Sequence, residues 1–136
     1  MELCRATYQE LGAISGIARR ADMWCYPSFV YAILIFFSCM LVLKKKKRVI
    51  GYICYMTLPI VKLGYIIQIA LHPDHQKKQL GGFMLDWTTH YLKETNHITR
   101  LALHTLKKPV MHWMQKRNFR TACSYGDSLW VMHKEV

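Results

Sequence analysis

The stretch Leu71-His72-Pro73-Asp74-His75-Gln76-Lys77-Lys78-Gln79-Leu80-Gly81-Gly82 decides how this sequence is interpreted. It follows an almost wholly apolar segment, Leu63–Leu71, which predicts a strand buried on both faces. After it, apolar residues recur at helical intervals between Phe83 and Leu92 and predict an amphipathic helix. The sequence therefore predicts a strand, a basic loop that ends in two glycines, and a helix, in that order.

Such a loop has the chemistry of an anion-binding site. The first-turn amides of a helix have no acceptor within the helix, and the helix dipole makes that end partly positive. The glycines let a ligand approach the backbone closely, and Lys77 and Lys78 add two full positive charges. We expect these groups to hold a phosphate or pyrophosphate. The alternative is a basic helix start that merely contains two glycines.

The loop resembles the acetyl-CoA-binding motif of the GNAT superfamily of N-acyltransferases, in which a strand and a proline turn lead to Arg/Gln-x-x-Gly-x-Gly/Ala at the start of a helix. Gln76 matches the first position of that pattern and Gly81 the last. Arg5-Ala6-Thr7, Val49–Ile53 and Trp113–Phe119 extend the resemblance over nearly the whole chain. It implies an α/β (α+β) fold, with one mixed, mostly antiparallel sheet of about six or seven strands and about four helices. It also implies a single domain over residues 1–136.

The resemblance implies that acetyl-CoA is the co-substrate and that its acetyl group passes directly to a primary amine of an acceptor. The backbone of the strand end would pair with the pantetheine arm, and the loop amides would hold the pyrophosphate. Lys107 stands where many members have an asparagine that touches the cofactor, and it would itself pair with phosphate. The implied cofactor-binding residues are Ile69, Ala70, Leu71, Gln76, Lys77, Lys78, Gln79, Leu80, Gly81, Gly82 and Lys107.

The positions of proton transfer depart from the family pattern. Met114 stands where a tyrosine usually protonates the thiolate, and Tyr65 and Ala102 stand where some members carry a glutamate base. We therefore expect His104 or Tyr125 to be the catalytic group, unless solvent supplies the proton. A catalytically weak acyl-CoA-binding relative is an alternative function, because Gln79 also replaces the first motif glycine.

Net charge and cysteine content limit the kinds of binding partner and the cellular compartment that we expect for this protein. The net charge of +11 suggests an acidic partner, but the basic residues are scattered and match no nucleic-acid module, so no specific nucleic acid is expected. The five cysteines form no C-x-x-C pair, which favours free thiols in a reducing, cytoplasmic compartment. His72 and His75 have metal-ligand spacing without a third ligand nearby, so no metal site is expected.

One segment favours a different function. Met23–Leu43 contains no charged residue, and the basic run Lys44–Arg48 follows at once. A small membrane-anchored protein with a spanning segment near 23–43 would show this pattern. A buried helix followed by a buried strand would show it too, with the basic run as a solvated hairpin turn.

The remaining elements follow from periodicity and turn signals. Thr7 and Glu10 form a capping-box pattern before a helix over about Tyr8–Arg19. The other expected elements are a strand at Leu3–Arg5, a helix between Asp22 and Ile33, strands at Ile35–Leu43, Val49–Leu58 and Ile98–Leu103, a short helix from Pro109, and a hairpin of Phe119–Tyr125 and Ser128–His133.

Overall fold

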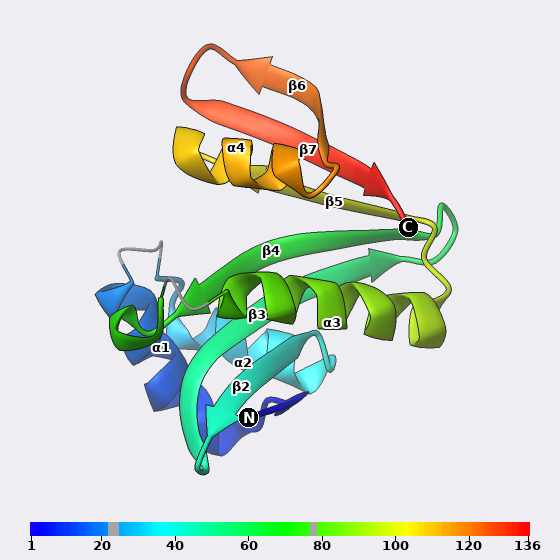
Figure 1. Cartoon of the computed structure of the whole chain (residues 1–136). Coiled ribbons are helices and arrows are strands. Elements are labelled where there is room, and N and C mark those ends of the chain that lie inside the picture. The colour runs from blue at the N-terminus through cyan, green and yellow to red at the C-terminus, as the bar shows by residue number, and fades with distance from the viewer. Residues whose placement is uncertain (22–24, 77–78) are drawn as a thin grey trace. The chain divides into compact units, whose positions relative to one another are not determined.

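The computed structural model describes residues 1–21, 25–76 and 79–136 (Figure 1). Its elements are β1 (Glu2–Arg5), the 3-10 turn η1 (Tyr8–Glu10), α1 (Leu11–Arg20), α2 (Ser28–Phe36), β2 (Met40–Lys45), β3 (Arg48–Leu58), β4 (Leu63–Leu71), the 3-10 turn η2 (Pro73–His75), α3 (Leu80–Asn96), β5 (Arg100–Thr105), α4 (Lys108–Lys116), β6 (Arg120–Tyr125) and β7 (Leu129–Glu135).

The strands form one seven-stranded sheet in the order β1-β2-β3-β4-β5-β7-β6. The pair β4–β5 is parallel, whereas β1–β2, β2–β3, β5–β7 and β6–β7 are antiparallel. The parallel pairing runs from Leu63 opposite Arg100 to Ile66 opposite Leu103, and β4 continues beyond it to Leu71. The predicted class, a mixed and mostly antiparallel sheet with four helices, is confirmed.

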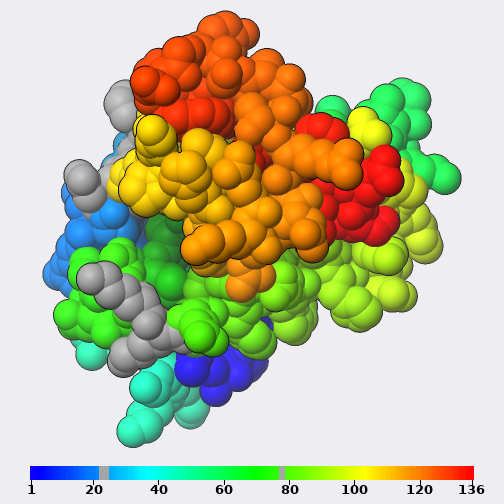
Figure 2. All heavy atoms as spheres, turned by 45° about the horizontal axis from the view of Figure 1, so that its top comes forward, coloured from blue at the N-terminus to red at the C-terminus, as the bar shows by residue number. Residues whose placement is uncertain are grey.

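The chain divides into two compact units, and β3, β4 and α3 each contribute residues to both. Unit 1 comprises residues 1–55 and 68–88, and unit 2 comprises residues 56–67 and 89–136. In unit 1, α1 and α2 lie on one side of the strands and the start of α3 lies on the other (Figure 1). In unit 2, α4 packs against β5, and α4 and β6 make up much of the face that Figure 2 turns forward.

A buried polar cluster fastens α2 to the sheet of unit 1. Tyr31 and Tyr52 are fully buried, and their rings meet edge to face with centroids 5.8 Å apart. Their hydroxyls both donate to Oε1 of Gln68, at 3.1 Å and 2.6 Å. Burial raises the pKa of both hydroxyls, so both stay protonated and keep donating. The cluster satisfies polar groups that would otherwise be costly to bury.

The boundary between α2 and β2 differs from the prediction. We expected a helix ending near Ile33 and a strand over Ile35–Leu43, but the helix continues to Phe36 and the strand begins at Met40. A Schellman motif ends the helix: Ser38 N donates to Ile35 O and Cys39 N to Leu34 O, with Ser38 at φ 56°. Glycine usually takes that left-handed position, so a serine there carries no stop signal in the sequence.

The alternative prediction of a membrane-spanning segment near 23–43 is wrong. Within the described residues, no helix combines the length and the hydropathy needed to cross a membrane. Residues 25–43 hold α2, its C-terminal turn and most of β2 instead, and the basic run forms the β2–β3 turn, as the hairpin alternative predicted.

The predicted capping box of Thr7 and Glu10 is present, and Lys44 forms an ion pair with Glu10. Thr7 N donates to Glu10 Oε1 at 2.7 Å, and Lys44 Nζ lies 2.8 Å from Glu10 Oε2. Burial alone would raise the pKa of Glu10, but hydrogen bonds from Lys44 and Thr7 outweigh it and lower the pKa below the ordinary 4.5. A carboxylate with a lowered pKa stabilises the folded state above its unfolded pKa and loses that contribution as pH falls through its folded value.

We expect Glu10→Gln to lower the free energy of unfolding at neutral pH by about 1 kcal/mol, because it removes the ion pair and weakens the cap. The difference from the wild type should begin to shrink as pH falls below the ordinary pKa of 4.5, and it should be lost as pH passes through the lower pKa of folded Glu10. Thermal unfolding at pH 7 and pH 3 measures this, with the exposed Glu2→Gln as control. The same deficit at both pH values would contradict the assignment.

Candidate functional site

The end of β4 packs unusually close to β3. A Cβ built on Gly51 would lie 2.9 Å from the carbonyl oxygen of Ala70 and 2.7 Å from the Leu71 side chain. The amide of His72 donates to the carbonyl of Ile50 at 2.8 Å. Ala70 and His72 therefore direct their backbone groups toward β3. Since backbone groups alternate along a strand, Ile69 and Leu71 direct theirs away from it.

That orientation matches part of the predicted site. A ligand that adds itself to β4 as an extra strand needs backbone groups that face away from β3, and Ile69 and Leu71 supply them. One of these groups is already used, because Gln76 Nε2 donates to the carbonyl of Leu71 at 3.1 Å. The amide of Leu71 and the backbone of Ile69 are thus the better candidates for ligand contacts.

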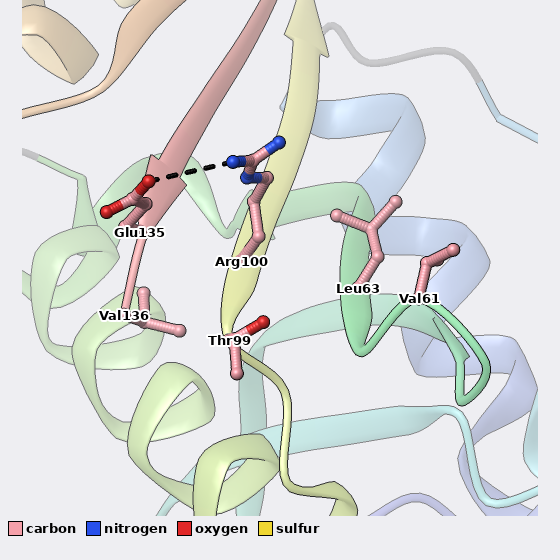
Figure 3. A pocket seen from close by; sticks show the side chains of 6 residues that line it. All are labelled: Val61, Leu63, Thr99, Arg100, Glu135 and Val136. Atoms are coloured by element: carbon pink, nitrogen blue, oxygen red, sulfur yellow. Dashed lines mark ion pairs between the residues drawn. The ribbon is translucent and has the colours of Figure 1, made fainter.

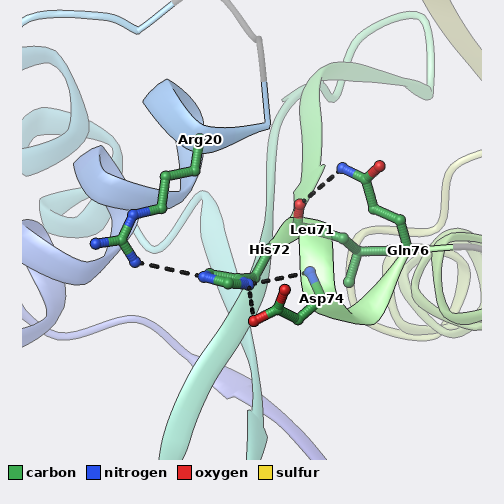
Figure 4. Close-up of polar contacts among 5 residues, drawn as sticks. All are labelled: Arg20, Leu71, His72, Asp74 and Gln76. Carbon is green, nitrogen blue, oxygen red and sulfur yellow. Dashed lines mark hydrogen bonds and ion pairs between the residues drawn. The ribbon is translucent and has the colours of Figure 1, made fainter.

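A short polar turn carries the chain from β4 to the next helix (Figure 4). His72 caps η2 by accepting from the amide of Asp74, and the guanidinium of Arg20 at the end of α1 lies 3.4 Å from its other ring nitrogen. Figure 4 shows the Gln76 side chain folded back onto Leu71. Lys77 and Lys78, predicted to bind phosphate, lie outside the described residues.

The predicted helix mouth is present where α3 begins. Gln79 has a positive φ of 61°, and its carbonyl accepts the first helical bond, from Phe83 N at 3.2 Å. The amides of Leu80, Gly81 and Gly82 therefore belong to the first turn, where no helical acceptor exists. Among the described residues, a Cβ on Gly81 would meet only the Leu71 side chain, at 3.8 Å. The backbone at Gly81 is thus open to a ligand.

A second group of polar side chains lies in unit 2. Tyr65 on β4 pairs with Ala102 on β5, and His104 follows two residues later on the same side of β5. The rings of Tyr65 and His104 are stacked at 5.8 Å, and the tyrosine hydroxyl is hydrogen-bonded to Nδ1 of the imidazole. His104 is exposed, and its Nδ1 is the ring nitrogen that contacts Tyr65.

Lys107 follows at the end of β5. It is the N-cap of α4, where its amide donates to Oγ1 of Thr105 at 3.1 Å and its carbonyl accepts from Met111 at 3.0 Å. Its own side chain is exposed. His104 and Lys107 thus stand close together in the chain at one end of β5, with a base and a cation available.

The sequence model of the acetyltransferase (GNAT) family matches residues 8–119. The chain belongs to this family. Solved structures with the same fold include Ard1 from Thermoplasma volcanium, with a TM-score of 0.85 and 14% identity over 99% of this chain and 97% of that one. No curated protein matches the sequence.

Two further GNAT structures share the fold at low identity. The PaiA N-acetyltransferase of Thermoplasma acidophilum, solved in complex with coenzyme A, has a TM-score of 0.78 and 16% identity, covering 99% of this chain and 98% of that one. The ribosomal-protein-S18-alanine N-acetyltransferase of Escherichia coli has a TM-score of 0.82 and 15% identity, covering 99% and 93%. At such identities the likeness establishes the GNAT fold.

Tyr125, the other catalytic candidate of this GNAT chain, lies apart from His104 within unit 2. His104 and Cys123 both face Val131 of β7, and Tyr125 follows at the β6–β7 turn, opposite Leu129. Two strand spacings and two residues separate it from His104, which amounts to roughly 12 Å. Tyr125 is 65% exposed, and its carbonyl accepts from Ser128 Oγ at 2.8 Å. Its catalytic role stays a prediction.

Unit 2 also holds a cavity, which lies away from the Tyr65–His104 group of this GNAT chain (Figure 3). Its volume is about 540 Å³, and it is lined by Val61, Leu63, Thr99, Arg100, Glu135 and Val136. Arg100 opens β5, whereas His104 stands near the other end of that strand. Among the residues that the structure describes, no group of three metal-ligating side chains lies close enough to hold an ion.

Sequence reasoning noted Tyr65 only as a substitution in the GNAT pattern and missed its bond to His104. The two residues are separated by β4, α3 and the start of β5. The parallel register between β4 and β5 brings them together, and no local signal encodes that register. The spacing of polar residues on the two strands would have been compatible with several registers.

Proposed function

We propose that this protein is an N-acetyltransferase that transfers the acetyl group of acetyl-CoA directly to a primary amine, with residues 1–136 acting as one transferase domain. The observation that carries the proposal is the helix mouth at Gln79–Gly82, which follows a strand with one buried face whose Ile69 and Leu71 direct their backbone groups away from β3. Membership of the GNAT family supports the same chemistry.

The cofactor side of the site uses backbone groups. The first-turn amides of α3, with the open position at Gly81, suit the pyrophosphate, because a helix N-terminus presents donors and a partial positive charge. The amide of Leu71 and the backbone of Ile69 would pair with the pantetheine arm. A backbone amide at Leu71 would also stabilise negative charge that develops on a carbonyl oxygen. The phosphate-binding role of Lys107, in unit 2, stays a prediction from the family resemblance.

The acceptor side needs a base, since only a neutral amine attacks. Acetyl-CoA supplies the acetyl group as a reactive thioester. We assign His104 as the base: its Nε2 takes the proton that the amine nitrogen loses as the new C–N bond forms and the C–S bond breaks. The contact with Tyr65 holds the imidazole in one orientation, and Nε2 can accept a proton in the tautomer whose Nδ1–H donates to the Tyr65 hydroxyl oxygen. The departing sulfur then takes a proton from the imidazolium or from water.

Cofactor binding and turnover test the proposal separately. Isothermal titration with acetyl-CoA should show saturable one-site binding, and incubation with acetyl-CoA and a panel of amine-bearing peptides should release free thiol. Binding without thiol release from any amine would favour the catalytically weak acyl-CoA-binding relative. Absence of binding would overturn the proposal as a whole.

The strained residue at the helix mouth gives a sharper test. Gln79 adopts a left-handed conformation that costs a non-glycine residue about 1 kcal/mol, and its side chain stands where the family motif has a bare backbone. We expect Gln79→Gly to raise the melting temperature and to tighten acetyl-CoA binding by about fivefold, because it removes both the strain and the side chain.

His97→Gly is the matched control for that variant. His97 also has a positive φ, 54°, but lies at the end of α3 outside the cofactor loop. It should gain stability without a change in acetyl-CoA affinity. Equal affinities of Gln79→Gly and the wild type would show that the loop does not approach the cofactor as proposed.

A further inference from the structure

Helix α2 exposes a stripe of large apolar side chains. Phe29, Ile33, Phe36 and Phe37 are 65%, 51%, 70% and 66% exposed, and they recur at intervals of four, three and one along the helix and its C-cap. The opposite face is held to the sheet by Tyr31 and Ile35, which are buried. Single exposed apolar residues are common on protein surfaces. A contiguous apolar stripe on one helix instead indicates a surface that binds another protein or a membrane.

The basic β2–β3 turn carries local backbone strain. Lys45 pairs with Arg48, so Lys46 and Lys47 are the two central residues, with φ values of 52° and 65°. Positive φ at both positions is the type I′ pattern, which strongly favours Asn-Gly over side chains such as lysine. A turn that keeps two lysines under strain points to a use for their charge.

The basic turn and the apolar stripe belong to the same unit and are joined by one strand. β2 leads from the end of α2 to the turn, a path of about 20 Å at the rise of a strand. Lys45, Lys46, Lys47 and Arg48 are all exposed, and the ion pairs of the described residues engage only Lys44 from this run. In Figure 1 the turn projects from the end of the hairpin.

We propose that the α2 stripe and the β2–β3 turn together dock the protein on an anionic lipid membrane surface, which it touches without crossing. Aromatic side chains enter the boundary between headgroups and acyl chains, while a cluster of basic residues is attracted to anionic headgroups. A second copy of the chain would bring two basic turns together and be repelled. A nucleic acid would engage the lysines and leave the phenylalanines in water.

Vesicle sedimentation with the full chain tests the proposal. Vesicles of phosphatidylcholine with about 30% phosphatidylserine should bind the protein at about 0.15 M salt, and pure phosphatidylcholine vesicles should bind it at least tenfold more weakly. Lys46→Asn with Lys47→Gly should weaken binding to the anionic vesicles about 20-fold, since two charges are lost. The same double variant should unfold at the same or a higher temperature, because Asn-Gly relieves the turn.

Two more variants complete the test. Phe36→Gln with Phe37→Gln should weaken binding at least tenfold by removing apolar area. Lys93→Asn with Lys116→Asn removes the same charge from exposed sites in unit 2 and should change binding less than about threefold.

Several results would overturn the docking proposal: no binding of the wild type to anionic vesicles, unchanged binding by the phenylalanine variant, or a dimer that the phenylalanine variant converts to monomer. Binding to a random DNA duplex that rivals vesicle binding, with loss only in the lysine variant, would assign the turn to nucleic acid instead. Acetyl-CoA affinity in the absence of vesicles should be the same in all variants.

Discussion

Replacing Gly81 with glutamate is expected to abolish acetyl-CoA binding while leaving the protein folded. Gly81 is the second residue of α3, and within the part of the chain that the structure describes a Cβ there meets only a Leu71 methyl group at 3.8 Å, which leaves room for a side chain. A carboxylate in the first turn also favours the helix dipole, and glutamate is a better helix former than glycine. The melting temperature should therefore stay the same or rise.

The ligand, by contrast, would meet a negative charge where its pyrophosphate is proposed to lie. We expect the affinity for acetyl-CoA to fall by about 100-fold, which corresponds to ~2.7 kcal/mol of binding free energy. Isothermal titration measures the affinity, and differential scanning calorimetry checks that the fold survives. A change confined to one residue would thus separate ligand binding from stability.

Gly12→Glu is a closely matched control. Gly12 is the second residue of α1, and a Cβ on it has nothing within 4 Å, so the substitution adds the same charge at the same position of another helix. It should raise stability in the same way and leave acetyl-CoA binding unchanged. If Gly81→Glu bound acetyl-CoA as tightly as Gly12→Glu, the pyrophosphate would have to lie elsewhere.

Removing the imidazole of His104 is expected to lower kcat/KM by about 100-fold, in the range of general-base catalysis, with little change in acetyl-CoA affinity. The reason is that His104 is exposed and contacts Tyr65, whereas the cofactor is proposed to lie on backbone groups of unit 1. His104→Gln keeps a polar side chain of similar size but cannot accept the proton of the attacking amine. Thiol release from acetyl-CoA with a reactive amine measures the rates.

Tyr65→Phe tests the orientation of the His104 ring separately from its role as the base. The ring stays stacked on the imidazole, but the hydroxyl that is hydrogen-bonded to Nδ1 is lost, so kcat should fall about tenfold and the base itself should remain. His112→Gln is the control, because His112 is an exposed histidine on α4 that contacts Gln115. Full activity in His104→Gln would remove His104 from the mechanism and leave Tyr125 or solvent to transfer the proton.

Much of the cofactor half of the candidate site could be predicted from the sequence because it is local. An apolar strand, a proline turn, a basic loop and a glycine pair are contiguous from Leu63 to Gly82, and each conformation depends on neighbours in the chain. The strand over Leu63–Leu71 and the helix after it were therefore predicted correctly, but burial of the strand on both faces was wrong, because burial alternates along β4, and the two glycines lie inside the first turn of α3. The positive φ of Gln79 was not, since a side chain there gives no sign of a left-handed backbone.

The end of α2 is a second place where the sequence shows no sign of a left-handed backbone conformation. Every residue of Ser28–Phe36 is compatible with a buried helix or a buried strand, and the stop signal is a serine in the conformation that glycine usually takes. Packing decided the outcome: Tyr31 and Ile35 are one helical turn apart, and both are buried. In a strand the two residues would also share a face, so periodicity over so short a segment could not choose.

By itself, the sequence determined the features that depend on neighbouring residues: the capping box at Thr7 and Glu10, the hairpin around the lysine run, and the glycine-ended helix mouth. Only the tertiary structure decided which distant residues meet: Lys44 with Glu10, Tyr31 with Gln68, and Tyr65 with His104. The physical reason is that local conformation follows from short-range sterics and hydrogen bonds, whereas strand register and helix packing are set by the burial of whole faces.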